Sequence, residues 1–143
     1  MNEALIANYN AKVKRNSLCY ILGDVGFDPL EPILKRLNGD KILIIGSHDK
    51  DALKYPQYFK QMTPLLNIVI EDQPITLCHF SMRTWGKSHY NSWMLFGHSH
   101  GRLEPFGKSF DVGVDAHGFY PWSFDEIKKK MELLPDNFNL IKK

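Results

Sequence analysis

Several features that mark other protein classes are scarce in this sequence of 143 residues. It has only two cysteines, Cys19 and Cys78, and each lies in an apolar run, which argues against a disulfide framework and favours a reducing environment. No apolar stretch approaches the roughly 20 residues that a membrane helix needs. The N-terminus is polar and lacks the pattern of a signal peptide. These absences predict a cytoplasmic protein that makes no membrane contact.

An excess of one charge, internal repeats and linkers are also missing. The formal net charge is +2, from 18 basic and 16 acidic residues, which does not point to nucleic acid or an anionic membrane as a partner. No low-complexity tract or Pro/Gly-rich segment divides the chain, so we predict a single domain over residues 1–143. The apolar fraction of 43% and the charged fraction of 24% are typical of a globular protein.

The periodicity of apolar residues predicts a mixed α/β fold in which helices pack on sheets. Continuous apolar strands favour sheets covered on both faces, with parallel pairing of the first two strands. Ser123 and Glu126 have the spacing of a capping box at the start of the last helix. The predicted helices cover residues 2–14, 30–37, 50–60 and 124–133; the predicted strands cover 18–22, 41–45, 67–70, 75–78 (a hairpin with 67–70), 93–96 and 110–114.

Metal-binding side chains directly follow four of these strands. In open α/β sheets, ligands bind at the carboxyl ends of strands, so four such ends can converge on one pocket. The residues are Asp24 after the first strand, Ser47, His48 and Asp49 after the second, His79 after the strand at 75–78, and His98 and His100 after the strand at 93–96.

Histidine and aspartate together are suitable ligands for divalent transition metals. A bridging carboxylate can hold two ions roughly 3.5–4 Å apart, where they orient a phosphate and lower the pKa of a bound water. An imidazolium near the leaving oxygen can act as a general acid. The residues therefore favour a metal site that acts on phosphate esters.

Each residue alone has a simpler interpretation. Asp24 is also a common turn residue, and Asp49 is a suitable N-cap for a following helix, a role compatible with orienting a nearby imidazole. An isolated histidine at a strand end is usually structural or on the surface. The site interpretation rests on the four strand ends together. Weaker candidates, expected in loops or turns, are Asp28, Arg83, Trp85, Lys87, His89 and His117.

These motifs, in this order, resemble those of the calcineurin-like metallophosphoesterase superfamily. The resemblance covers about residues 19 to 101, and residues 111–127 are similar to the tail of small bacterial and phage members. Gly-His-Ser-His is its most specific element. The matching motifs are Gly23-Asp24, Gly46-Ser47-His48-Asp49, His79 and Gly97-His98-Ser99-His100-Gly101.

The resemblance implies roles for these residues. Asp24 would bridge two metals, His79 and His98 would bind one of them, and His100 would bind the other. His48 would be the acid that assists the leaving group, with Asp49 as its orienting partner. The resemblance also implies a four-layer fold, in which a two-sheet β-sandwich is flanked by helices. The ions would be Mn, Fe, Zn, Ni or Mg, one or two per chain.

Two departures from the family pattern modify this expectation. Ser47 stands where the family has an asparagine ligand, and a serine hydroxyl is a shorter and weaker one. The family also opens with a strand that ends in Asp-x-His, and no such motif precedes Asp24. We therefore expect that an N-terminal strand is missing, that the site holds one metal or a weakly bound pair, and that a homodimer covers an exposed sheet edge.

The function predicted from these residues is hydrolysis of a phosphomonoester or phosphodiester by a metal-activated water. The alternative is a truncated relative that binds metal or a partner without turnover. Nucleic-acid binding has little support, because the charges are nearly balanced.

Overall fold

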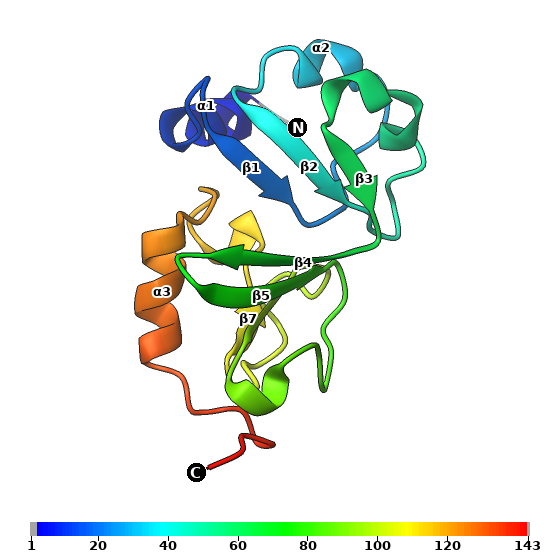
Figure 1. The fold of residues 1–143 in the computed structure, drawn as a ribbon. Helices are drawn as coiled ribbons and strands as arrows, with labels where there is room; N and C mark the ends of the chain where they lie inside the picture. The colour runs from blue at the N-terminus through cyan, green and yellow to red at the C-terminus, as the bar shows by residue number, and fades with distance from the viewer. Residues whose placement is uncertain (1–2, 143) are drawn as a thin grey trace.

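The computed structural model describes residues 3–142 and contains two β-sheets with few helices, which confirms the predicted α/β class (Figure 1). Residue 2, where the predicted first helix begins, lies outside the described residues. The elements in chain order are α1 (Glu3–Lys12), β1 (Leu18–Ile21), α2 (Glu31–Leu34), β2 (Asp40–Ile44), β3 (Gln61–Thr63), β4 (Leu65–Ile70), β5 (Gln73–Cys78), β6 (Trp93–Phe96), β7 (Ser109–Asp111) and α3 (Phe124–Glu132).

The first sheet is parallel, in the order β1-β2-β3. The predicted parallel pairing of the first two strands is confirmed, with Leu18 opposite Asp40 and Ile21 opposite Leu43. The predicted helix over residues 50–60 is wrong. Two short 3-10 helices, Ala52–Lys54 and Pro56–Tyr58, take its place because Pro56 removes a backbone donor, and β3, which the sequence analysis missed, follows them.

The second sheet is mixed, in the order β4-β5-β6-β7. Strands β4 and β5 form the predicted antiparallel hairpin, in which Leu65 lies opposite Cys78. Strands β6 and β7 then add in parallel. The last strand ends at Asp111, three residues earlier than predicted, and a 3-10 helix begins at Val114.

Three apolar clusters lie on the faces of these sheets. One is shared by the two sheets and also receives α3, through Phe124, Ile127 and Met131. A second lies between the first sheet and α1, and a third lies on the other face of the second sheet, around Trp85. Apolar residues on both faces explain why the strands have continuous apolar sequences rather than alternating ones.

The last helix begins as predicted. Ser123 Oγ accepts a hydrogen bond from the Glu126 backbone N–H at 3.2 Å, and the Glu126 carboxylate accepts from the Ser123 N–H at 2.9 Å, which completes the capping box. Glu126 also forms an ion pair with Lys12 of α1. Among residues 3–142, no helix has the length and apolarity to cross a membrane.

Candidate metal centre

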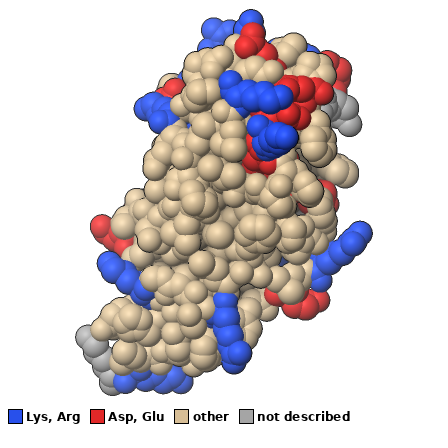
Figure 2. Space-filling view, turned by 90° about the vertical axis from the view of Figure 1, so that its right-hand side faces the viewer, with Lys and Arg blue, Asp and Glu red and all other residues tan. Residues whose placement is uncertain are grey.

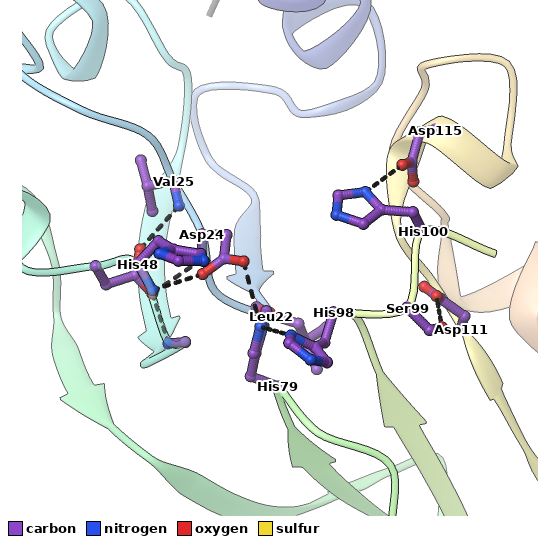
Figure 3. Close-up of polar contacts among 12 residues, drawn as sticks. Leu22, Asp24, Val25, His48, His79, His98, Ser99, His100, Asp111 and Asp115 are labelled. Atoms are coloured by element: carbon purple, nitrogen blue, oxygen red, sulfur yellow. Dashed lines mark hydrogen bonds and ion pairs between the residues drawn. The ribbon is translucent and has the colours of Figure 1, made fainter. Parts of the chain in front are cut away.

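The loops that follow β1, β2, β5 and β6 meet at one end of the two sheets (Figure 3). Parallel pairing of β1 with β2, and of β5 with β6, puts the carboxyl ends of each pair side by side. Asp24, His79 and His98 come from three of these loops and form the one group of potential metal ligands found among the described residues. Their ligand atoms all lie within 4.8 Å of one another.

His79 is the centre of this cluster. Its Nε2 lies 3.3 Å from Asp24 Oδ2 and 3.1 Å from His98 Nδ1. The ring is 1% exposed, whereas Asp24 is half-buried and His98 is exposed. The cluster therefore has a buried base and an open side, as a metal site that must admit a substrate requires.

The main chain fixes the orientation of the His79 ring. Its Nδ1 lies 2.7 Å from the carbonyl oxygen of Leu22, which can only accept, so Nδ1 carries a proton. In the neutral ring, Nε2 then presents a lone pair toward Asp24 and His98. A lone pair facing a carboxylate requires a cation or a proton between them, and this arrangement of a ligating histidine is common in metal proteins.

Asp49 joins two of the loops. Its carboxylate accepts backbone hydrogen bonds from Asp24 at 3.0 Å, Val25 at 2.8 Å and Gly46 at 2.6 Å. The side chain is 1% exposed. Since all three donors belong to the main chain, the contacts found for this carboxylate hold the loops after β1 and β2 together, and none of them is to the imidazole of His48.

Gly23 and Gly46 allow these loops to approach closely. A Cβ atom on Gly46 would lie 2.7 Å from Asp24 Oδ1 and 2.9 Å from His79 Nδ1. A Cβ atom on Gly23, whose φ is +89°, would lie 2.5 Å from His79 Nδ1. No side chain fits at either position unless the cluster moves.

Three site residues adopt a left-handed backbone that non-glycine residues seldom use. The φ angles are 54° for Asp24, 64° for His98 and 52° for His100. Such conformations cost on the order of 1–3 kcal/mol each and persist where the surrounding structure imposes them. These three lie in the loops that carry the candidate ligands, and five other non-glycine residues with positive φ in the described chain lie elsewhere, at Glu71, Asp72, Lys87, Asn91 and Phe119.

The other predicted site residues lie around the cluster. His100 turns to Asp115, with Nδ1 2.6 Å from Asp115 Oδ2, and its side chain is 67% exposed (Figure 3). Ser47 and His48 are exposed, and the His48 backbone N–H donates to Asp24 Oδ1 at 2.9 Å. The structure thus brings three of the five predicted ligands together, and His100 lies outside this group of histidine and aspartate side chains.

Asp111 is a structural counterpart of Asp49 that the sequence analysis did not identify. Its carboxylate is nearly buried and accepts hydrogen bonds from the Ser99 hydroxyl, from Gly101 N–H at 2.9 Å and from Gly113 N–H at 2.7 Å. It therefore shapes the loop that carries His98 and His100. The one available signal was a carboxylate at the end of a buried strand.

Comparisons with known proteins identify similar proteins, but the ones described below are uncharacterized and indicate no activity. No family model matches the chain. It is 28% identical over 144 residues to an uncharacterized protein of Methanocaldococcus jannaschii, a match that covers 92% of this chain and 76% of that protein. The crystal structure of a protein of unknown function from Aquifex aeolicus superposes with a TM-score of 0.69 at 22% identity, over 89% of this chain and 83% of that one. This second likeness shows that the two chains share a fold.

Proposed function

We propose that this chain is a metal-dependent phosphoesterase of the calcineurin-like superfamily, which hydrolyses a phosphomonoester or phosphodiester. The observation that carries the proposal is the convergence of Asp24, His79 and His98 at the carboxyl ends of strands. With the family assignment we also propose the finer architecture, a four-layer sandwich with two central sheets. The superposition on the Aquifex aeolicus protein supports the shared fold alone.

The cluster is chemically suited to a divalent cation. One carboxylate oxygen and two imidazole nitrogens are ligands that Mn, Fe, Zn and Ni all accept, and Mg would rely on the carboxylate and on water. Three protein ligands with an open position are typical of catalytic rather than structural sites. Such an ion would supply positive charge that polarises a phosphoryl oxygen and lowers the pKa of a bound water.

The residues around the cluster have distinct proposed roles. His48 is exposed and its backbone N–H contacts Asp24, and its proposed role is to give a proton from the imidazole to the leaving oxygen. Asp49 keeps the loops of Asp24 and His48 in register through the main chain. Asp111 does the same for the loop of His98. The last two are positioning residues, since their contacts reach the site only through the backbone.

Hydrolysis of bis(p-nitrophenyl) phosphate in the presence of Mn²⁺ tests the proposal. We expect a rate that requires Mn²⁺ and is lost in His98→Ala. His89→Ala is the matched control, because His89 lies in a 3-10 helix outside the cluster. A rate equal in wild type and His98→Ala, or no rate at any Mn²⁺ concentration, contradicts the proposal.

A second candidate function is metal binding without turnover. It is favoured by the position of His100, which contacts Asp115 rather than the cluster, and by the exposure of Ser47. Within residues 3–142 these positions leave one group of three ligands rather than two metal sites. Stoichiometric Mn²⁺ binding that needs His98, combined with no hydrolysis of any phosphate ester, would select this candidate.

Nucleic-acid binding remains the weakest of the three candidates. Figure 2 shows one face of the molecule, on which charged side chains of both signs gather near the ends and the centre is largely uncharged. A protein that tracks a phosphate backbone needs a continuous basic surface instead. The described part of this face offers none.

A further inference from the structure

Phe27 is an aromatic side chain that the fold leaves open to solvent beside the candidate site. It follows Asp24 in the loop after β1, and its exposed fraction of 70% is the highest of any aromatic residue in the described chain. Its ring centroid lies 6.3 Å from that of His48. Single apolar side chains on a surface are ordinary, so exposure alone indicates nothing. Two features distinguish Phe27 from such a side chain: its loop is fixed on both sides, and it contacts a site histidine.

The loop that carries Phe27 is held in place on either side of the ring. On one side Val25 is buried, and its backbone N–H donates to Asp49 Oδ1 at 2.8 Å. On the other side the Asp28 carboxylate accepts a hydrogen bond from the Tyr55 hydroxyl at 2.8 Å. The exposed ring therefore lies between two anchored neighbours. A group that is already fixed loses little conformational freedom when a ligand binds to it.

The Phe27 ring lies on the His48 side of Asp24. Asp24 Oδ1 accepts a hydrogen bond from the His48 backbone N–H at 2.9 Å, and its other oxygen, Oδ2, lies 3.3 Å from His79 Nε2. In Figure 3, Asp24 accordingly lies between His48 and the histidines His79 and His98. Within residues 3–142, the ring contact found for Phe27 is with His48 alone. The ring thus borders the candidate acid and not the candidate metal ligands.

Phe80 is the other exposed aromatic residue in contact with site histidines, and it differs from Phe27. Its ring centroid lies 4.9 Å from that of His79 and 4.8 Å from that of His98. Packing against two candidate ligands explains the position of this ring, which is 46% exposed. Phe27 contacts neither ligand, so the same explanation does not apply to it.

A fixed and exposed phenyl ring beside a phosphate site is suited to stacking with a flat aromatic group. Base–aromatic stacking strengthens binding by about fivefold or more for each base. An aryl group attached directly to the phosphate would lie against the cluster and would not reach Phe27, because the contacts run from Phe27 through His48 to Asp24. In a nucleotide, the ribose separates the base from the phosphate and supplies the missing length.

We propose that the phosphate ester bound at this site is a nucleotide, whose base stacks on Phe27 while its phosphate binds at the cluster of Asp24, His79 and His98. The inference rests on the proposed function, because it requires the cluster to hold a phosphate group. Every base has a π-face, so stacking distinguishes nucleotides from other phosphate esters but discriminates little among the bases.

Binding of phosphonate analogues tests the inference without turnover. In these compounds a CH₂ group replaces the ester oxygen, so they cannot be hydrolysed at that bond. Titration calorimetry of the full chain with Mn²⁺ compares the analogue of adenosine 5′-monophosphate with the analogue of ribose 5-phosphate. We expect the adenosine compound to bind about tenfold more tightly. Benzylphosphonate, which carries an aromatic ring without a ribose, should bind no more tightly than the ribose compound.

Variants of Phe27 assign the difference to the ring. Phe27→Ala should weaken binding of the adenosine compound about fivefold or more and change that of the ribose compound by less than about twofold. Phe27→Leu keeps an apolar side chain but loses the π-face, so it should behave as Phe27→Ala does. Tyr90→Ala is the matched control, because Tyr90 is 60% exposed and its ring contacts His89, outside the cluster. It should bind both compounds as wild type does.

The outcomes separate this inference from the proposed function. Equal affinities of the adenosine and ribose compounds would overturn the nucleotide inference, even if bis(p-nitrophenyl) phosphate is hydrolysed. The same conclusion follows if the adenosine compound does not bind saturably, or if it binds to Phe27→Ala or Phe27→Leu as it does to wild type. Preference for the adenosine compound that depends on Phe27, without hydrolysis of any ester, would support a nucleotide-binding site and contradict phosphoesterase activity.

Discussion

His79, directly after β5, and Leu22, directly after β1, are joined by a hydrogen bond of 2.7 Å between the imidazole Nδ1 and the main-chain carbonyl oxygen, which connects the two sheets. This contact selects one tautomer of the ring and directs the other nitrogen to Asp24 and His98. The fold thereby fixes the orientation of a potential metal ligand. In metal proteins, removing the hydrogen bond that the second nitrogen of a ligating histidine makes commonly reduces metal affinity by roughly 10–100-fold.

The first prediction concerns the buried ligand of the cluster. His79→Gln keeps a polar side chain in the space but removes the nitrogen that faces Asp24, so Mn²⁺ affinity should fall at least tenfold. Titration calorimetry against wild type measures the change. His89→Ala, away from the cluster, should bind Mn²⁺ as wild type does. Unchanged affinity in His79→Gln would mean that the contact between His79 and Asp24 is an ordinary ion pair.

The second prediction separates His100 from the cluster. Because His100 contacts Asp115 and lies outside the group of three ligands, His100→Ala should change the affinity for the first Mn²⁺ by less than threefold. His98→Ala, two residues earlier, should reduce that affinity at least tenfold. If the two variants lose affinity equally, His100 moves to the metal on binding, as the family resemblance implies.

The third prediction concerns Asp49. Its carboxylate accepts three main-chain hydrogen bonds and is almost completely buried. Asp49→Asn keeps the shape but turns an amide donor toward one of the N–H groups. We expect a loss of about 2–4 kcal/mol in the free energy of unfolding, measured in urea. Asp72→Asn is the control, since Asp72 is exposed in a turn at φ 67°, where asparagine is well tolerated. Equal stability of the two variants would exclude a role for Asp49 in joining the loops.

The fourth prediction tests the close approach of the loops after β1 and β2. In Gly46→Ala the new methyl group would lie 2.7 Å from Asp24 Oδ1 and 2.9 Å from both the Asp24 backbone nitrogen and His79 Nδ1, so the contact between Asp24 and His79 must rearrange. Mn²⁺ affinity should fall at least tenfold. Gly86→Ala meets nothing closer than 3.8 Å and should leave the affinity unchanged. Wild-type Mn²⁺ binding by Gly46→Ala would contradict this prediction and would show that the cluster tolerates a side chain at this position.

Much of this architecture is present in local sequence patterns. The hairpin β4-β5 and the capping box at Ser123 depend on residues close together in the chain, and both were predicted with the correct partners. The convergence of the candidate ligands was also predictable, because each of them follows a strand and the carboxyl ends of such strands can meet at one pocket. The 3-10 helices near Pro56 and the three-residue β3 were not predicted, because short elements gain their stability from tertiary contacts rather than from periodicity.

In the candidate site, too, the local sequence predicts some features, and the tertiary fold determines the others. The motifs identify Asp24, His79 and His98 as potential ligands, but they do not show which residue each side chain will contact. His100 is two residues from His98, yet its left-handed backbone and Asp115 direct it elsewhere. The role of Asp111 is likewise set by donors 10 and 12 residues away in the loop that it stabilises, and by the nearby Gly113. Such contacts are properties of the fold and not of the local pattern.

The last prediction concerns pH and the ion pair between Lys12 of α1 and Glu126 of α3, which joins these two helices. The Lys12 ammonium, followed by the Ser123 backbone N–H, lowers the pKa of Glu126 from 4.5 to about 2. A folded-state pKa below the unfolded one stabilises the fold fully above pH 4.5, and the contribution is lost as the pH falls toward 2. Glu126→Gln should therefore cost about 1 kcal/mol or less at pH 7, because the pair is partly exposed, and the difference should vanish near pH 2.

Urea unfolding of wild type and Glu126→Gln at several pH values between 2 and 7 measures this difference. Glutamine still accepts the hydrogen bond from Ser123, so the capping box is kept and the variant isolates the charge. Lys12→Met supplies the partner variant, and in its background Glu126→Gln should have almost no effect at pH 7. A difference that stays constant down to pH 2 would exclude the charge of Glu126 as its source, because a protonated carboxyl group can no longer pair with Lys12.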